Sequence, residues 1–217
     1  MGLLPELTAP AELYYNEKES KNYNNNSRIT KIQGDITQRA LDLLKVDCEV
    51  PLFLDIGCGG GLSGQILSEN GYEWVGVDIS QDMLSVARQK SKNLGLIQAD
   101  IGEELPFRDE SFDYAISISA VQWLFQSYKN EHVPIKRIRT FFRSLYNVVR
   151  KSAAVQFYCG KKEIEILKCE AKKAGFYGGI VIDDEGSKNV KHFLILEKFR
   201  RSKDVKKYSR QLNKKRT

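Results

Sequence analysis

Cysteine and histidine are scarce in this chain of 217 residues, which restricts the kinds of site it can hold. The four cysteines are scattered with no Cys-x-x-Cys pair, and two histidines accompany them: Cys48, Cys58, Cys159, Cys169, His132 and His192. We therefore expect neither a zinc site nor a disulfide framework within the chain, and we predict no metal-binding residue. This usage of cysteine is typical of a reducing compartment, the cytosol or the nucleus.

Long apolar runs are missing as well. No stretch approaches the roughly 18 residues that a membrane-spanning helix needs, and the first residues lack the character of a signal peptide, so no membrane association is expected. The length suffices for one sizeable core and lies below the size at which chains usually divide. We predict an N-terminal helical lid over 1–45, a main domain over 46–198 and a basic tail over 199–217.

Acidic residues almost disappear at the C-terminal end. Residues 198–217 contain ten Lys or Arg and one acid, a net charge of +9, and because the whole chain carries +6, residues 1–197 carry −3. A segment with so few apolar residues is predicted to be disordered when free. It is either a solvated tail that aids solubility, or an arm for RNA or nuclear import with the Lys-Lys-Arg string at 214–216 as a basic address.

A second basic group lies between Lys129 and Lys151. Apolar residues recur there at helical spacing and predict an amphipathic helix: Ile138, Phe141, Phe142, Leu145, Val148 and Val149. Its outer face is predicted to be cationic, with Lys136, Arg137, Arg139, Arg143 and Arg150. Such a face is either simply solvated or in contact with phosphates.

Glycines are concentrated directly after an apolar run over 52–56, which is predicted to be a buried strand. Gly57, Gly59 and Gly61, with Cys58 between them, allow the backbone to turn sharply and to pass close to a ligand. A dinucleotide site usually reads Gly-x-Gly-x-x-Gly and presents a helix N-terminus to a pyrophosphate. Here the spacing differs, and Asp55 would repel a pyrophosphate but suits an ammonium and a sulfonium. The loop therefore favours S-adenosylmethionine (SAM) over NAD.

A second predicted strand, 74–77, ends at Asp78, where a carboxylate is placed to accept hydrogen bonds from both ribose hydroxyls. Asp100 and Ile101 follow a third strand and are predicted to flank the adenine, with the carboxylate taking its exocyclic amine. Ile79 and Met83 pack either on the adenine ring or in ordinary contacts between helix and sheet. Asp100 has an alternative role as a cap at the end of its strand.

The remaining sequence alternates between helical and strand patterns. The predicted helices are 63–70, 81–92 and 163–174, the second of them capped by Ser80. The further strands are 94–99, 114–119 and 153–158, with a closing antiparallel pair over 179–183 and 192–197. This alternation predicts a doubly wound, Rossmann-like α/β sheet with its ligand at the carboxyl ends of the strands. Asp55, Asp78, Asp100 and Ser117 all fall at those ends.

The acceptor side is predicted from the segment that leaves the fourth strand, Ser119 to Leu124. Trp123, Gln122 and Tyr15 are candidates for this side, although no catalytic residue is assigned. For Trp123 two alternatives remain: it stacks on a planar base, or it belongs to the core. Tyr23 and Arg28 precede the glycine loop, and with Tyr14 and Tyr15 they are candidates for a lid over the cofactor and base.

Two absent motifs restrict the acceptor atom. No Asn/Asp-Pro-Pro-Tyr/Phe follows the fourth strand, which argues against methylation of an exocyclic or amide nitrogen. No Pro-Cys nucleophile is present, which argues against attack at pyrimidine C5. These absences favour an acceptor atom that already has a free lone pair, and guanine N7 is such an atom. Its methylation needs alignment of the reactants rather than a general base.

Several strings together resemble one family. They include Pro10-Ala11-Glu12-Leu13-Tyr14-Tyr15, Leu54-Asp55-Ile56-Gly57-Cys58-Gly59, Trp74-Val75-Gly76-Val77-Asp78 and Ser117-Ile118-Ser119-Ala120-Val121-Gln122-Trp123-Leu124. From about Pro10 to Lys198 the chain resembles the eukaryotic 18S ribosomal RNA guanine-N7 methyltransferases of small-subunit biogenesis. This resemblance implies a seven-stranded class I SAM-dependent fold with an antiparallel closing strand, and action on pre-40S particles in the nucleus and cytoplasm.

The resemblance also implies a partner, a small zinc-ribbon activator protein that stabilises the enzyme. Strand 94–99 is predicted to lie at a sheet edge, and an apolar edge invites another strand, so we expect Leu94 to Ala99 to join the partner's sheet. Two features depart from the family: Cys159-Gly160 replaces its usual Pro-Glu, and the basic tail is short. The alternatives are a methyltransferase of another acceptor, such as tRNA or a small lipophile, and a pre-40S assembly factor whose catalysis is dispensable.

Overall fold

The computed structural model describes residues 4–90, 95–129, 132–187 and 189–199. Its strands are β1 (Leu52–Ile56), β2 (Glu73–Asp78), β3 (Gly95–Gln98), β4 (Phe112–Ile118), β5 (Val149–Phe157), β6 (Tyr177–Asp183) and β7 (Lys191–Glu197). The helical elements are η1 (Pro5–Leu7), α1 (Ala11–Tyr14), α2 (Glu17–Asn25), α3 (Ser27–Leu44), α4 (Leu62–Glu69), α5 (Gln81–Lys90), η2 (Val121–Phe125), α6 (Pro134–Val148) and α7 (Lys161–Ala174).

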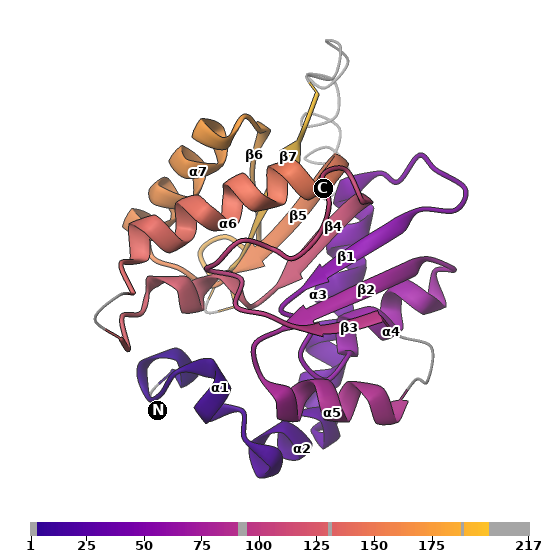
Figure 1. The fold of residues 1–217 in the computed structure, drawn as a ribbon, viewed down its shortest axis with the longest axis vertical. Helices are drawn as coiled ribbons and strands as arrows, with labels where there is room; N and C mark the ends of the chain where they lie inside the picture. The colour runs from indigo at the N-terminus through magenta and orange to yellow at the C-terminus, as the bar shows by residue number, and fades with distance from the viewer. Residues whose placement is uncertain (1–3, 91–94, 130–131, 188, 200–217) are drawn as a thin grey trace.

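The strands form one seven-stranded sheet in the order β3-β2-β1-β4-β5-β7-β6 (Figure 1). Strands β1 to β5 pair in parallel, whereas β7 runs antiparallel to both β5 and β6. The predicted Rossmann-like sheet with an antiparallel closing strand is confirmed. Strand order reverses at β1, which lies between β2 and β4, and such a switch point leaves a crevice at the carboxyl ends of the strands.

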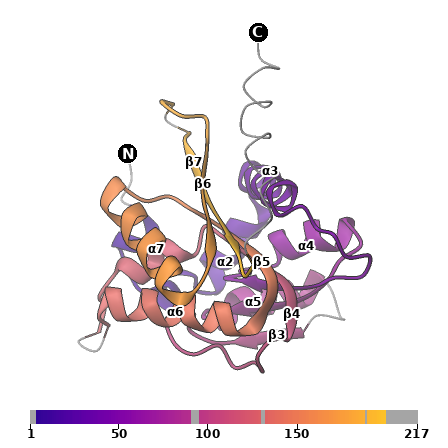
Figure 2. The same ribbon diagram turned by 90° about the horizontal axis from the view of Figure 1, so that it is seen from above.

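Side chains alternate between two apolar layers, because successive residues of a strand point to opposite faces. Leu54 and Ala115 pack with α6 and α7, whereas Phe53 and Tyr114 on the other face pack with α3, α4 and α5. Figure 2 shows α6 and α7 on one side of the sheet and α3 and α4 on the other. Helix α3 thus contributes Ile36, Ala40, Leu41 and Leu44 to the core at 5% exposure or less.

Most predicted elements appear within a few residues of their expected bounds. Ser80 caps α5 as predicted, since its hydroxyl accepts a hydrogen bond from Met83 N at 3.2 Å. Residues 91–92, Leu94 and the tail residues 200–217 lie outside the described residues. Within the described ranges, no helix has both the length and the apolar character to cross a bilayer.

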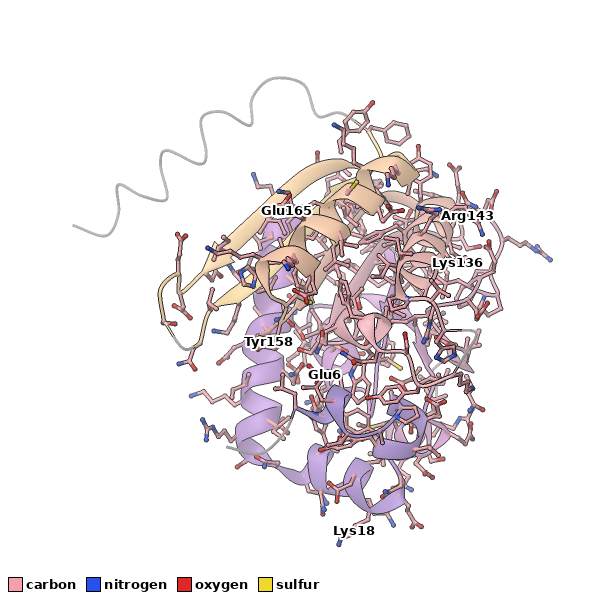
Figure 3. The ribbon with its side chains drawn as sticks, turned by 90° about the vertical axis from the view of Figure 1, so that its left-hand side faces the viewer. Glu6, Lys18, Lys136, Arg143, Tyr158 and Glu165 are labelled. Atoms are coloured by element: carbon pink, nitrogen blue, oxygen red, sulfur yellow. The ribbon has the colours of Figure 1, made fainter. Side chains whose placement is uncertain are left out.

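The amphipathic helix is confirmed as α6, but its predicted cationic outer face is wrong in part. Arg137 points into a cavity rather than to solvent, with 11% of its side chain exposed. The neighbouring arginines meet carboxylates from other elements: Arg139 pairs with Glu170 at 2.9 Å, Arg143 with Glu104, and Arg150, in β5, with Asp113 at 3.2 Å. Figure 3 labels Lys136 and Arg143 close to each other, and both are exposed residues of α6. Tertiary pairing therefore neutralises much of this face.

Candidate active site

The glycine loop between β1 and α4 is held by backbone hydrogen bonds. Gly57, Gly59 and Gly61 all have positive φ, at 73°, 51° and 79°, in the left-handed region that favours glycine. The amides of Gly57 and Cys58 donate to Val77 O at 2.8 and 3.0 Å, which ties the loop to the end of β2. A Cβ on Gly57 would overlap the Ala120 side chain, so the loop packs closely against the segment after β4.

Asp78, at the end of β2, organises the loop from the other side. Its Oδ2 accepts from Gly59 N and its Oδ1 from Ser80 N, both at 2.8 Å. Burial raises the pKa of this carboxyl, while the amide hydrogen bonds oppose the shift. Because each carboxylate oxygen has two acceptor positions, both retain one for further donors such as ribose hydroxyls.

Asp55 lies beneath the loop with no exposed surface. Its Oδ2 accepts from the Ser63 hydroxyl at 2.6 Å, and its Oδ1 is buried without a partner among the described residues. Burial raises the pKa of Asp55 to about 7. An unpartnered buried carboxylate oxygen is relieved by a nearby cation, so the site fits a ligand that carries an ammonium and a sulfonium.

One cavity extends from this loop to the ends of β2 and β4. Eleven of the residues predicted for the site line it: Tyr15, Tyr23, Gly57, Cys58, Gly59, Asp78, Ile79, Met83, Asp100, Ile101 and Trp123. The other five do not line it: Asp55, Gly61, Ser117, Gln122 and Arg28.

The predicted site residues that do not line the cavity lie elsewhere in the fold. Gly61 precedes α4, and Ser117 is buried within β4. Gln122 is also buried, and its Nε2 donates to Ser119 O at 2.9 Å, which braces the segment after β4. Arg28 is exposed in the first turn of α3.

Sequence reasoning assigned no site role to several polar residues that line the cavity, among them Glu12, Gln33, Tyr128, His132 and Arg137. Most of them come from segments far from the glycine loop in the sequence, so no local motif marks them. One signal for Arg137 was present: it precedes Phe141 by four residues, and this spacing places two side chains on the same helix face. Phe141 is fully buried, so the position of Arg137 is close to the core.

Aromatic side chains close one side of the cavity. The ring centroid of Trp123 lies 5.8 Å from that of Tyr15 and 6.1 Å from that of Tyr14, and Tyr15 lies 5.6 Å from Tyr23. Tyr15 O also accepts from the Ser80 hydroxyl at 2.8 Å, which anchors the N-terminal segment beside Asp78. Burial raises the pKa of Tyr23 to about 12 and also raises that of Tyr15, so both phenols lose their protons less readily than an exposed tyrosine does.

The seven-stranded sheet, the left-handed glycine loop, the buried Asp55 and the acid at the end of β2 together define a class I SAM-dependent methyltransferase. A methyltransferase-domain family matches residues 54–157. Among solved structures, the SAM-bound magnesium protoporphyrin IX methyltransferase of Synechocystis superposes with a TM-score of 0.66 at 15% identity, covering 91% of this chain and 99% of that one. That likeness concerns the fold alone.

Closer relatives identify the family. The chain is 46% identical over 198 residues to a probable 18S rRNA (guanine-N7)-methyltransferase of Dictyostelium discoideum, covering 88% of this chain and 69% of the relative. It is 42% identical over 188 residues to the 18S rRNA (guanine(1575)-N7)-methyltransferase of Saccharomyces cerevisiae, covering 85% and 68%. This chain belongs to the 18S rRNA (guanine-N7)-methyltransferase family, and its methyl donor is SAM.

Proposed function

We propose that this protein transfers a methyl group from SAM to N7 of a guanine in 18S ribosomal RNA. The observation that carries the proposal is the cavity itself, which the glycine loop and Asp78 line together with the aromatic pair of Tyr15 and Trp123. A planar purine can stack on a ring face that this pair presents to the cavity, because every base has a π-face on which an aromatic side chain can stack. The relatives in this family are named for this reaction.

Each part of the cofactor has a proposed set of protein groups. Asp78 holds the ribose hydroxyls, and Asp100 with Ile101 contacts the adenine, on which Ile79 and Met83 pack. The loop from Gly57 to Gly61 passes along the methionine part, and Asp55 compensates its positive charge from below. Tyr23 borders this part of the cavity, whereas Arg28 is proposed to contribute from outside it.

The reaction as proposed moves no proton. The N7 lone pair forms the new N–C bond while the C–S bond breaks, so the sulfonium becomes a neutral thioether and the positive charge passes to the purine. Burial raises the pKa values of the cavity phenols Tyr15 and Tyr23 above their ordinary value, which makes them poorer sources of a phenolate base and agrees with a mechanism without a general base. Alignment of two reactants supplies about 7–11 kcal/mol of barrier reduction in favourable cases.

The test is methyl transfer from labelled SAM to small-subunit RNA or pre-40S particles, followed by nucleoside analysis. We expect label in 7-methylguanosine, at the guanine corresponding to position 1575 in the name of the yeast relative. Label in another nucleoside would identify a different acceptor. SAM binding without any RNA labelling, in particles and with the partner present, would refute the proposed reaction.

We propose that a small zinc-ribbon activator binds along strand β3. This strand ends the sheet order, and within the described residues β2 is its pairing neighbour. Leu96 and Ile97 make it apolar and half-buried. An Ile97→Asp variant should lose the partner in co-purification, because it places a charge in the apolar layer that β3 would share with an added strand. The matched control is Ile182→Asp in β6, the opposite edge strand; equal binding by both variants would contradict the proposal.

We further propose that the protein works in the nucleus and cytoplasm, where small subunits are assembled, and that its basic tail contributes to RNA binding. RNA affinity should fall by orders of magnitude between about 50 and 200 mM salt if six or more phosphates are contacted. Since carboxylates pair with much of α6, deletion of residues 200–217 should reduce this slope more than an Arg143→Met substitution does. If the RNA affinity of the full chain does not change with salt concentration, the proposed electrostatic contribution to RNA binding is contradicted.

A further inference from the structure

A charged side-chain cluster spans the cavity wall between the end of β3 and helix α6. The Nη2 of Arg137 donates to both oxygens of Asp100, at 2.6 Å to Oδ1 and 2.8 Å to Oδ2. Its Nη1 lies 2.9 Å from Nδ1 of His132. All three residues line the cavity, and Arg137 and Asp100 have only 11% and 20% of their side chains exposed. This pair is therefore part of the cofactor cavity and separate from the exposed pairs elsewhere on α6.

The cluster leaves Asp100 with one acceptor position. Each carboxylate oxygen accepts about two hydrogen bonds. Oδ1 takes one from Arg137 and another, at 2.8 Å, from Gly102 N, whereas Oδ2 takes one from Arg137. The remaining position is on Oδ2, and a carboxylate there accepts from an amine but repels a carbonyl oxygen.

Packing also fixes where the guanidinium lies. A Cβ on Gly102 would overlap Nε, Nη2 and Cζ of Arg137, so the arginine occupies the space that a side chain at position 102 would take. The Nε of Arg137 is buried and has no hydrogen-bond partner among the described residues. Among the described residues, the guanidinium forms its hydrogen bonds with Asp100 and His132. A side chain at position 102 would displace the guanidinium while keeping every charge.

We propose that Arg137 is a positioning residue for the cofactor: it holds the Asp100 carboxylate so that its single free acceptor position reads the 6-amino group of adenine. The contact of Asp100 with adenine is part of the proposed function; the role of Arg137 goes beyond it. Without Arg137, Asp100 is free to rotate and regains acceptor positions that point elsewhere. The selection of an amino group over a carbonyl at the purine 6-position then weakens, as does affinity for the cofactor.

The experiment compares S-adenosylhomocysteine with S-inosylhomocysteine, which has a carbonyl in place of the 6-amino group, by calorimetry on the full chain. No RNA is needed, so the result is independent of whether the acceptor is guanine. In Arg137→Met we expect Kd for the adenosyl compound to rise at least about tenfold, the effect of losing one charge-assisted hydrogen-bond network. The preference for adenosyl over inosyl should fall by a similar factor. Arg137→Lys should retain part of the preference for the adenosyl compound, because lysine keeps the positive charge but lacks the forked hydrogen-bonding geometry of arginine.

Two further variants make the test decisive. Gly102→Ala should reproduce a smaller version of both changes, because it moves the guanidinium without removing it. Arg143→Met, which removes an arginine of the same helix paired with exposed Glu104, should change neither affinity nor preference. An unchanged Kd in Arg137→Met would overturn the proposal, as would equal weakening of both compounds, which would assign Arg137 a purely structural role. If Arg137→Met does not fold, Gly102→Ala and Arg137→Lys replace it. An unchanged Kd for the adenosyl compound, or equal weakening of both compounds, in these two variants would then overturn the proposal.

Discussion

The two sides of the cavity are built in different ways. On the cofactor side, β1, the glycine loop and Asp78 lie within 27 consecutive residues (52–78), and backbone hydrogen bonds join them. On the acceptor side, Tyr15 lies more than 100 residues before Trp123 and Tyr128 in the sequence, and side-chain packing brings the two segments together. The Tyr128 hydroxyl, for example, donates to Glu6 O of the N-terminal segment.

This difference in construction matches a difference in the task of the two sides, since one serves the common cofactor and the other suits the choice of acceptor. A loop held by its own backbone needs glycines and acids at set spacings and tolerates few replacements, so it serves the common cofactor. A wall made of side chains from distant elements changes with each substitution, so it suits the choice of acceptor. We therefore expect variants on the cofactor side to abolish function and variants on the acceptor side to tune it.

The largest effect is expected for Asp78→Lys. The substitution removes the acceptor of Gly59 N and Ser80 N and places a cation where the ribose is proposed to bind. SAM binding measured by calorimetry should be lost, whereas Asp109→Lys, at an exposed position, should bind normally. If Asp78→Lys nevertheless supports production of small subunits in cells, the protein acts mainly as an assembly factor.

A pair of glycine variants tests whether close approach, rather than backbone strain, governs the loop. Gly57 and Gly71 have similar φ, 73° and 77°, but a Cβ on Gly57 would overlap Ala120 whereas one on Gly71 would meet nothing within 4 Å. Gly71→Ala should cost about 1–2 kcal/mol of stability from the left-handed backbone and leave SAM affinity intact. Gly57→Ala should in addition weaken SAM binding by about two orders of magnitude or more, through a displaced segment after β4. Equal SAM affinity in the two variants would show that this contact does not matter.

On the acceptor side, Trp123→Ala should reduce kcat/KM for RNA by about 10- to 100-fold, the effect of losing one stacking partner of a base. SAM affinity should change by much less. Phe125→Ala, in the same segment but absent from the cavity wall, is the matched control. A loss of SAM binding in Trp123→Ala that equals the loss in RNA activity would assign Trp123 to the cofactor side.

The smallest effect expected on cofactor binding is a pH dependence caused by Asp55. Its pKa is raised from 3.8 to about 7 by burial, so without ligand the folded protein holds this proton over a pH range where the unfolded chain has released it. This contribution to stability therefore falls as pH rises from about 4 to about 7 and is flat above. A cationic cofactor favours the ionised form, so SAM affinity should rise through pH 7. Asp55→Asn should remove both dependences, measured by thermal unfolding and calorimetry; identical profiles in the two proteins would contradict this.

Much of the cofactor side could be predicted from the sequence, because its signals are local. The glycine spacing, the acid at the end of the second strand and the Ser80 cap each depend on residues close together in the chain. The acceptor side could be predicted only in outline: Trp123 and Tyr15 were candidates, but Glu12, Tyr128 and His132 carried no local signal. Arg137 was misplaced because a helical period distinguishes faces only coarsely, and the position of Asp100 relative to α6 depends on how the helix packs on the sheet.

The sequence by itself determined the alternation of strands and helices, the order of the elements and the residue types at the turn after β1, because these depend on hydrophobic period and backbone sterics. Only the tertiary structure decided which charges are free. It paired Arg139, Arg143 and Arg150 with acids from other elements and turned Arg137 toward Asp100. The reason is physical: a charge acts over the distance to its nearest partners, and those distances are set by packing between segments far apart in the chain.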